Sequence, residues 1–273
     1  MALWRVRTSA GERLARGPLD AGPVELLDAT LDELLAAGTL DAPAAGAVEP
    51  GAAILAPVAG QEVWAAGVTY EASRTARDEE SGGAHDFYDR VYDAERPELF
   101  FKAAPGRVRG PGEPIGVRAD SGWDVPEPEL ALVLSAAGEI LGYTIGNDVS
   151  SRSIEGENPL YLPQAKVFRG SCALGPAIVP VAEAPPASEL EIALTIARGG
   201  APVFEGSTQV ARMRRGLEEL AGWLFRALDF PVGAVLLTGT SVIPAAEFTL
   251  RAGDEVRIAI TGLGELVNPV EAV

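Results

Sequence analysis

Three acidic residues near the middle of the chain have a spacing that could hold a metal ion. Glu127 and Glu129 are separated by one residue, and the alternation of residue types over 127–134 predicts a strand. Side chains two positions apart on a strand project from the same face, so the two carboxylates should lie side by side. Two ionised carboxylates in that arrangement repel each other unless a cation or a proton lies between them.

A third carboxylate follows beyond a predicted partner strand. The segments 127–134 and 140–145 flank the turn-like residues 136–139, which predicts a β-hairpin. The hairpin would bring Asp148, at the far end of the second segment, close to Glu127 and Glu129. Three carboxylates without a histidine suit Mg²⁺, Mn²⁺ or Ca²⁺. A solvated strand face with an ordinary Asn-Asp turn remains the alternative interpretation.

Composition limits the partners and the chemistry of this chain of 273 residues. Its formal net charge of -17 argues against nucleic acid, because phosphate binding needs clustered Lys and Arg. The single cysteine, Cys172, and the single histidine, His85, exclude an internal disulfide and argue against a zinc site. No secretory leader is apparent, and no apolar run approaches the ~20 residues of a membrane span. We therefore expect a cytoplasmic protein without membrane contact.

The remaining pattern favours a β-rich core with few helices. Further strands are expected at 62–68, 99–103, 190–196, 203–205, 235–238 and 256–261. The second hairpin, between 190–196 and 203–205, should turn at Gly199-Gly200. Helical spacing predicts helices over 24–37 and 213–228.

Two irregular segments suggest how the chain is divided. The Ala- and Pro-rich segment 42–53 is typical of a linker, so we expect a small N-terminal domain, 1–58, and a catalytic domain, 59–273. The polar segment 69–97 is typical of a lid or a binding loop.

The order of several short motifs resembles the fumarylacetoacetate hydrolase family. The motifs are Gly67-Val68-Thr69-Tyr70, Phe100-Phe101-Lys102, Glu127-Pro128-Glu129-Leu130, Gly142-Tyr143-Thr144, Asn147-Asp148-Val149-Ser150, Lys166, Leu174-Gly175-Pro176 and Thr238-Gly239-Thr240. The resemblance implies a mostly β (α+β) fold, with a mixed β-roll core of the family's type and a small N-terminal domain. It implies Glu127, Glu129 and Asp148 as Mg²⁺ ligands, Lys166 beside the substrate, and a homodimer or homotetramer.

One departure separates the chain from the hydrolases of that family. Those enzymes typically carry a histidine three residues after the tyrosine of the first motif and a glutamate three residues further on. That pair activates the water that breaks a C–C bond. The corresponding positions here are Ser73 and Ala76, which cannot act as a general base at neutral pH. His85 could replace them only through a different path of the chain.

The 2-keto-3-deoxy-D-arabinonate dehydratase branch of the family resembles the chain more closely. The shared features include Gly67-Val68-Thr69-Tyr70-Glu71, Val91-Tyr92-Asp93-Ala94, Arg96-Pro97-Glu98, Glu155-Gly156-Glu157-Asn158-Pro159 and Met213-Arg214-Arg215. This resemblance implies Mg²⁺-dependent dehydration of a 2-keto-3-deoxy sugar acid to a 2-oxo acid semialdehyde through a metal-bound enolate. Ser153 stands where the family has an aspartate, which leaves the support of Arg152 open.

Predicted roles follow from that reaction, which removes a C3 proton and expels the C4 hydroxyl. The catalytic candidates are Lys166 with Glu71 or Glu155 as its partner. The candidates for substrate binding are Lys102, Thr240 and Arg152, with Lys102 neutralising the substrate carboxylate. Lys102 and Lys166 are the two lysines of the chain, every other basic residue being arginine.

Two other functions stay open at this point. A hydrolase of an acylpyruvate-type C–C bond, or an enzyme similar to oxaloacetate decarboxylase, would share the fold and the metal. A non-catalytic, metal-stabilised binding protein would explain the loss of the His/Glu pair. In the first two cases the partner would again be a small 2-oxo acid, and analysis of the products would separate the reactions.

Overall fold

The computed structural model describes residues 1–71 and 90–273, and this part of the chain is mostly β. The strands are β1 (Ala2–Thr8), β2 (Gly11–Gly17), β3 (Glu25–Leu27), β4 (Ala44–Ala47), β5 (Ala53–Leu55), β6 (Glu62–Gly67), β7 (Glu98–Ala103), β8 (Ile115–Val117), β9 (Asp124–Val125), β10 (Pro128–Leu134), β11 (Ile140–Asp148), β12 (Ser150–Ser151), β13 (Cys172–Pro180), β14 (Glu191–Arg198), β15 (Ala201–Gln209), β16 (Ala234–Leu237), β17 (Asp254–Ile260) and β18 (Gly264–Ala272). The helices are α1 (Leu31–Ala37), α4 (Arg152–Glu157), α5 (Leu162–Lys166) and α6 (Leu217–Leu224). Within these two ranges no helix has the length and apolar character needed to cross a membrane.

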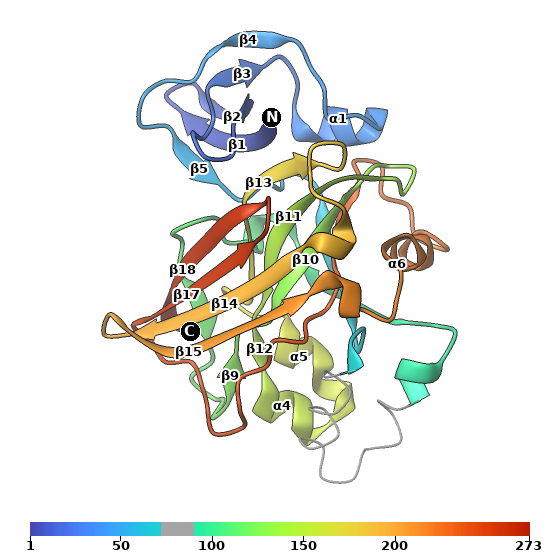
Figure 1. Cartoon of the computed structure of the whole chain (residues 1–273), viewed down its shortest axis with the longest axis vertical. Helices are drawn as coiled ribbons and strands as arrows, with labels where there is room; N and C mark the ends of the chain where they lie inside the picture. The colour runs from blue at the N-terminus through green and yellow to red at the C-terminus, as the bar shows by residue number, and fades with distance from the viewer. Residues whose placement is uncertain (72–89) are drawn as a thin grey trace.

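Two large sheets form the body of the molecule (Figure 1). The larger sheet has the strand order β4-β3-β2-β1-β13-β11-β10-β16-β6-β7, with β5 paired to β1. The smaller sheet has the order β15-β14-β17-β18-β8, and β9 pairs with β12 separately. Most neighbours run antiparallel, but β16 is parallel to β6 and β18 is parallel to β8. The sheets are therefore mixed, which confirms the predicted fold class.

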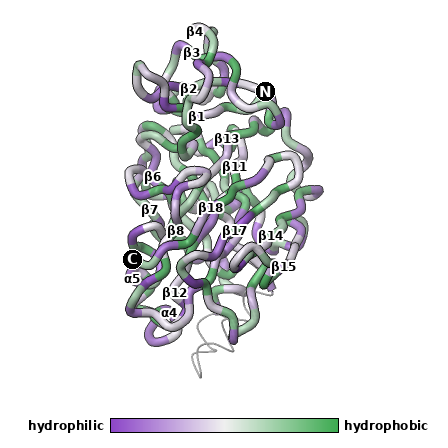
Figure 2. The backbone as a smooth tube through the Cα atoms, turned by 90° about the vertical axis from the view of Figure 1, so that its left-hand side faces the viewer, coloured by the Kyte–Doolittle hydropathy of each residue, from purple (hydrophilic) through white to green (hydrophobic). Residues whose placement is uncertain are grey.

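The N-terminal strands and the short helices lie at opposite ends of the molecule. β1 to β5 and α1 form one end, whereas α4 and α5 lie at the other end in both views (Figures 1 and 2). The larger sheet nevertheless runs through the predicted domain boundary, because β1 pairs with β13 at Leu3 and Ile178. The division into 1–58 and 59–273 stays a prediction.

The hairpin that carries the acidic residues forms as predicted. β10 and β11 pair antiparallel, from Pro128 opposite Asn147 to Leu134 opposite Ile140. Every residue of β10 is buried, and β11 and β16 flank the strand within the sheet. A carboxylate in such a strand, that of Glu129, must find a partner or lose its charge. The second predicted hairpin, β14 with β15, also forms.

The predicted helix over 24–37 is wrong in its first half. Residues 25–27 form β3 and pair with β2, and the helix begins after Thr30. The hydroxyl of Thr30 accepts the N–H of Glu33, and the Glu33 carboxylate accepts the N–H of Thr30. This reciprocal capping box fixes the start of α1. Gly38 then ends the helix in the left-handed conformation, at a φ of 70°.

Two further expectations fail because pairing and packing override the local pattern. Residues 42–53 are not an unpaired linker, since β4 pairs with β3 and β5 with β1, which satisfies their backbone groups. The helix predicted over 213–228 is limited to α6. Met213 forms a bridge with Tyr70, and Phe225 leaves the helix and packs against Phe230 with ring centroids 4.9 Å apart. β18, which pairs with β17 and β8, was not predicted.

Leu132→Ala is expected to lower the free energy of unfolding by about 2–5 kcal/mol, because it leaves a cavity in the centre of the sheet. Leu132 is fully buried and lies between Tyr143 and Leu236 on the neighbouring strands. The matched control, Leu160→Ala, removes a side chain that is 85% exposed and should cost less than about 0.5 kcal/mol. Urea denaturation followed by circular dichroism measures both. Equal losses in the two variants would contradict this packing.

Candidate active site

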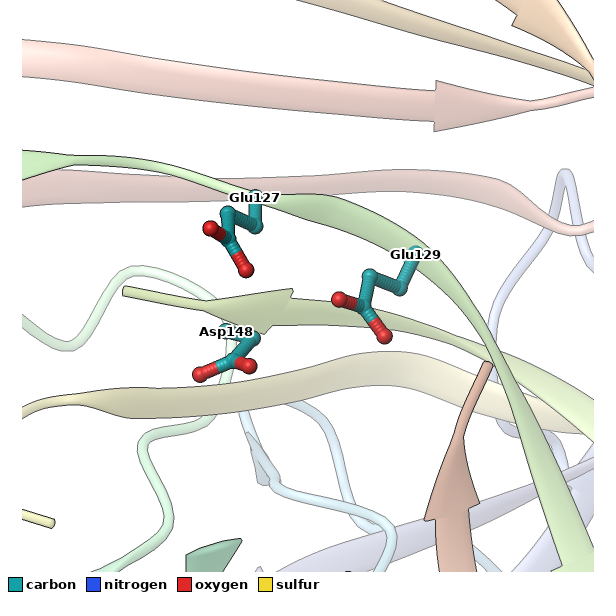
Figure 3. A group of neighbouring side chains, drawn as sticks. All are labelled: Glu127, Glu129 and Asp148. Carbon is teal, nitrogen blue, oxygen red and sulfur yellow. The ribbon is translucent and has the colours of Figure 1, made fainter. Parts of the chain in front are cut away.

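Glu127, Glu129 and Asp148 converge inside the protein (Figure 3). One carboxylate oxygen of each residue lies within 4.8 Å of the other two, and all three side chains are buried. We call these residues the carboxylate triad. The structure therefore brings together the three residues that were predicted as metal ligands.

The register of the hairpin accounts for this convergence. Glu129 lies opposite Gly146, and the backbone N–H of Asp148 donates to the carbonyl of Glu127 at 3.0 Å. Asp148 also lies opposite Cys172 of β13, so strands on both sides fix its backbone. Two paired strands and one short turn are thus sufficient to assemble the triad.

The environment of Glu129 opposes its negative charge. Burial raises the pKa of Glu129 well above its usual value, and the charges of Asp148 and Glu127 raise it further. The N–H of Gly239 acts in the other direction, donating to Oε2 of Glu129 at 2.6 Å. Gly239 has a φ of 91°, and a Cβ there would lie 2.1 Å from Oγ1 of Thr69, so only glycine fits. An added cation would relieve the repulsion that remains.

Lys166 reaches the carboxylate triad from the end of α5. Its Nζ lies 2.7 Å from Oε2 of Glu127 and 3.1 Å from Oδ2 of Asp148, and it donates to Oγ of Ser150 at 2.5 Å. Two carboxylates at these distances favour the ammonium form of the lysine. An ammonium group donates protons and neutralises negative charge. The predicted role of Lys166 as a base stays a prediction, and these contacts favour a role as a cation or an acid.

Lys102 is fully buried behind the carboxylate triad. Its Nζ forms an ion pair with Asp148 and donates to the carbonyls of Val149, at 3.0 Å, and Lys166, at 2.5 Å. A buried ammonium group needs such partners, because desolvation of an unpaired charge is costly. These contacts favour a role in positioning Asp148 and Lys166. The predicted contact of Lys102 with the substrate carboxylate stays a prediction.

Arg152 approaches the triad from the start of α4. Its Nη2 donates to Oε1 of Glu127 at 2.7 Å, and its Nε lies 3.9 Å from Oε2 of Glu155. Ser153, which replaces an acidic residue of the family, is exposed and its Oγ lies 2.8 Å from Oγ of Ser121. Glu127 and Glu155 hold Arg152 in place, so the lack of a carboxylate at position 153 does not release it.

A small cleft opens onto the carboxylate triad. Besides the triad it is lined by Gly67, Val68, Phe100, Arg152, Lys166 and Thr240. Val68 has a φ of 52°, a strained conformation for a β-branched residue and one that is concentrated at functional sites. The buried Thr240 hydroxyl accepts the N–H of Val242 at 3.1 Å. Three of the predicted residues, Arg152, Lys166 and Thr240, therefore line the same cleft as the triad.

A second cavity, of about 370 Å³, is lined in part by two further acidic residues, Glu98 and Glu155. A Cβ on Gly67 would lie 1.9 Å from Oε2 of Glu98, so this carboxylate rests directly against a residue that lines the cleft. Glu155 adjoins the cleft through Arg152. Glu98 was not among the residues predicted from the sequence, although it belongs to the motif Arg96-Pro97-Glu98 that carried the resemblance.

Glu71 lies at the boundary of the residues that the structure describes. It is exposed, whereas the preceding residue, Tyr70, is buried. Burial and the charge of Glu129 raise the pKa of the Tyr70 phenol above its usual value. Ser73, Ala76 and His85 lie outside the described residues, and the catalytic role of Glu71 stays a prediction.

The donor set fits a hard divalent cation. The triad offers oxygen atoms alone, which suit Mg²⁺, Mn²⁺ or Ca²⁺. Cys172 is not a competing ligand, because burial raises the pKa of its thiol to about 12 and keeps it protonated. The ammonium groups of Lys102 and Lys166 and the guanidinium group of Arg152 balance the three carboxylates. A bound divalent ion would thus supply excess positive charge for an anionic ligand.

Comparison with known proteins decides the family. The model of the fumarylacetoacetate (FAA) hydrolase C-terminal region matches residues 62–271. The chain belongs to the fumarylacetoacetate hydrolase family. This membership confirms the resemblance that the motifs indicated, and the match includes the carboxylate triad, the cleft and Glu98.

Within the fumarylacetoacetate hydrolase family the chain is similar to sugar-acid dehydratases. A probable 2-keto-3-deoxyxylonate dehydratase of Haloferax volcanii is 54% identical over 217 residues, which are 80% of this chain and 74% of that protein. The 2-dehydro-3-deoxy-D-arabinonate dehydratase of Saccharolobus solfataricus is 47% identical over 221 residues, with the same coverage. A solved structure of 2-keto-3-deoxy-D-arabinonate dehydratase complexed with magnesium and 2,5-dioxopentanoate superposes with a TM-score of 0.88 at 38% identity, covering 100% of this chain and 99% of that one.

Mg²⁺ is expected to raise the melting temperature, because an ion bound by the folded state alone stabilises that state. Glu129→Ala should weaken Mg²⁺ binding by at least about 100-fold, since changes outside the ligand set already cost 10–100-fold. Isothermal titration calorimetry measures the affinity. Glu205→Ala, at an exposed position on β15, is the control and should bind Mg²⁺ like the wild type. Unchanged affinity in Glu129→Ala would contradict the assignment of this ligand.

Lys102→Met is expected to lower the free energy of unfolding of the metal-free protein by about 3–5 kcal/mol, because it removes one of the two buried ammonium groups that pair with Asp148 and leaves a buried negative charge uncompensated. Chemical denaturation in the presence of EDTA measures the change. A variant that unfolds like the wild type but has a raised KM for substrate would instead support the predicted contact between Lys102 and the substrate carboxylate.

Proposed function

We propose that this protein is a Mg²⁺-dependent hydro-lyase that dehydrates a 2-keto-3-deoxy sugar acid to a 2-oxo acid semialdehyde. The proposal rests on a buried carboxylate triad next to Lys166 and Arg152, in a chain that is 54% and 47% identical to two sugar-acid dehydratases. Mn²⁺ or Ca²⁺ would suit the same oxygen ligands. The substrate class is a small five-carbon 2-oxo acid with a hydroxyl group on C4.

The overall reaction removes one molecule of water without oxidation or reduction. When bound, the metal ion supplies a Lewis acid that makes the C3 hydrogens of a 2-oxo acid acidic. The residues of the chain must then accept a proton from C3 and give a proton to the hydroxyl that leaves C4. Tautomerisation of the unsaturated product places the aldehyde on C5.

The residues around the cleft suit different parts of this task. The ammonium group of Lys166 can neutralise the negative charge that develops when C3 loses its proton. Arg152 and Thr240 line the same cleft and can bind substrate oxygens. Both lie close enough to the triad to orient a substrate that is held there.

We assign the base to a carboxylate outside the triad, with Glu98 as the first candidate. A carboxylate that accepts a proton must reach the cleft without being a metal ligand. The Glu98 carboxylate lies against Gly67, which lines the cleft, and Glu155 lies beside Arg152, which lines it too, so both are near enough to be candidates. Glu71 is exposed at the edge of the described residues. Glu155 and Glu71 remain candidates for the acid that protonates the leaving hydroxyl.

Hydrolysis of an acylpyruvate is the runner-up function. It would use the same metal and fold, but the positions of the usual His/Glu pair hold Ser73 and Ala76. A non-catalytic binding protein is disfavoured, because the triad and Lys166 line one cleft and two further carboxylates lie beside residues of that cleft.

The cellular setting belongs to the same proposal. We place the enzyme in the cytoplasm, in the catabolism of pentoses, as a homodimer or homotetramer. A net charge of -17 supports the expectation that it binds neither nucleic acid nor an anionic membrane surface. Size-exclusion chromatography with light scattering would determine the oligomeric state.

Purified protein with Mg²⁺ is expected to convert a 2-keto-3-deoxy-pentonate to 2,5-dioxopentanoate, measured by NMR of the products. Glu127→Ala should abolish turnover, because it removes a triad carboxylate, whereas Glu205→Ala should retain it. Both C4 epimers of the substrate should be compared, since C4 is the one stereocentre that remains in a 2-keto-3-deoxy-pentonate. Release of pyruvate from an acylpyruvate, without dehydration, would overturn the proposal in favour of the hydrolase.

Glu98→Gln is expected to lower kcat by about 10²–10⁴-fold while Mg²⁺ affinity stays within a factor of about two, because the change removes a base but no metal ligand. Glu155→Gln and Glu71→Gln are the matched comparisons. Steady-state kinetics and calorimetry measure the two quantities. If Glu155→Gln or Glu71→Gln, and not Glu98→Gln, shows this loss, the base is assigned to the wrong carboxylate.

A further inference from the structure

The segment Met213-Arg214-Arg215 contacts two parts of the chain that are distant in sequence. Met213 forms an antiparallel bridge with Tyr70, and the backbone N–H of Arg214 donates to the carbonyl of Thr69 at 2.9 Å. Thr69 in turn donates its hydroxyl to the carbonyl of Thr238 at 2.7 Å. The segment is therefore anchored beside Gly239, whose N–H binds Glu129.

Arg215 connects the same segment to residues 91–95. Its guanidinium group donates to the carbonyls of Val91, at 3.2 Å, Ala94, at 2.6 Å, and Glu95, at 2.9 Å. A fourth acceptor is the carboxylate of Glu219, at 2.7 Å, and the Arg215 side chain is only 8% exposed. Three carbonyl groups of one short segment thus converge on one guanidinium group, a geometry that matches its planar set of donors.

Two neighbouring contacts hold the same region. The guanidinium carbon of Arg96 lies 4.7 Å from the ring centroid of Trp223 on α6. Arg214 donates to Oδ1 of Asp93 at 2.6 Å. The chain from 91 to 96 is therefore fixed against α6 and the residues 213–215 before it.

The position of Glu98 depends on this attachment. Residues 91–96 lead directly into β7, whose first residue, Glu98, lies opposite Gly67 of β6. The Glu98 carboxylate rests against Gly67, which lines the cleft. A shift of residues 91–96 would move the carboxylate relative to the triad, whereas the triad itself is held by β10, β11 and β13.

We propose that Arg215 is a positioning residue for the proposed dehydration, because it ties residues 91–95 to a segment that is bonded to Thr69 and Tyr70, next to the cleft residue Val68, and thereby places the Glu98 carboxylate. This inference rests on the proposed function. Proton abstraction is sensitive to such placement, since a displacement of about 1 Å can cost about 100-fold in rate. We expect Mg²⁺ binding to be independent of the hydrogen bonds between Arg215 and residues 91–95, because the triad is held by other strands.

The test compares Arg215→Gln and Arg215→Lys with Arg212→Gln, an exposed position on the same segment. Arg215→Gln should lower kcat by about 10- to 100-fold, with Mg²⁺ affinity unchanged. Arg215→Lys should recover part of the loss, because an ammonium group satisfies some but not all of the carbonyls. Hydrogen–deuterium exchange should increase in peptides covering 90–103 and stay unchanged in 127–148. Arg212→Gln should match the wild type in every measurement.

A second assay separates this inference from the proposed function. Exchange of the C3 hydrogens of 2-oxopentanoate in D₂O, followed by NMR, reports proton abstraction from a 2-oxo acid that has no hydroxyl group to lose. Wild type that exchanges but never dehydrates overturns the proposed function alone, and a slower exchange in Arg215→Gln still supports the positioning role. Normal kcat and exchange in Arg215→Gln, or a kcat loss matched by an equal loss of Mg²⁺ affinity and global unfolding, overturns the positioning role.

Discussion

The repulsion among three buried carboxylates is the constraint on which the rest of the site depends. Glu127, Glu129 and Asp148 bring their oxygens within 4.8 Å in the interior of a sheet, where charge is poorly solvated. Burial and neighbouring charge raise the pKa of Glu129, so the triad would take up protons if nothing else were supplied. Lys102, Lys166, Arg152 and the N–H of Gly239 contact the triad oxygens and offset part of that repulsion.

The responses come from separate elements of the fold. α5 delivers the ammonium group of Lys166, α4 delivers the guanidinium group of Arg152, and β7 buries Lys102 beneath Asp148. The turn after β16 supplies the N–H of Gly239. Because the strands under the triad are paired on both sides, the backbone cannot spread to separate the carboxylates. A divalent cation would relieve the repulsion that remains.

Local spacing was sufficient to predict the triad but not its surroundings. The alternation around Glu129 and one tight turn determine the register of β10 and β11, so the approach of Asp148 follows from neighbouring sequence. The contact of Glu98 with Gly67 depends on the pairing of β6 with β7, which are separated by 30 residues of chain. The burial of Lys102 likewise depends on distant segments, because its ammonium group donates to the carbonyls of Val149 and Lys166. The helices predicted over 24–37 and 213–228 are longer than α1 and α6. Apolar spacing does not show where a capping residue or a β-bridge limits a helix.

Charge balance connects the site to a 2-oxo acid rather than to a neutral ligand. With the carboxylates and the three cations in balance, a divalent ion leaves an excess of two positive charges. A 2-oxo acid carries one negative charge, and it gains a second when C3 loses its proton. The triad, the three cations, the ion and the substrate are then neutral together at that stage, in a region where an uncompensated charge is costly; Glu155, beside Arg152, lies outside this count. This favours proton removal over simple binding, and it requires an acceptor that is not already committed to the triad. We propose Glu98 as this acceptor; it is the first residue of β7 and follows residues 91–95, which Arg215 holds.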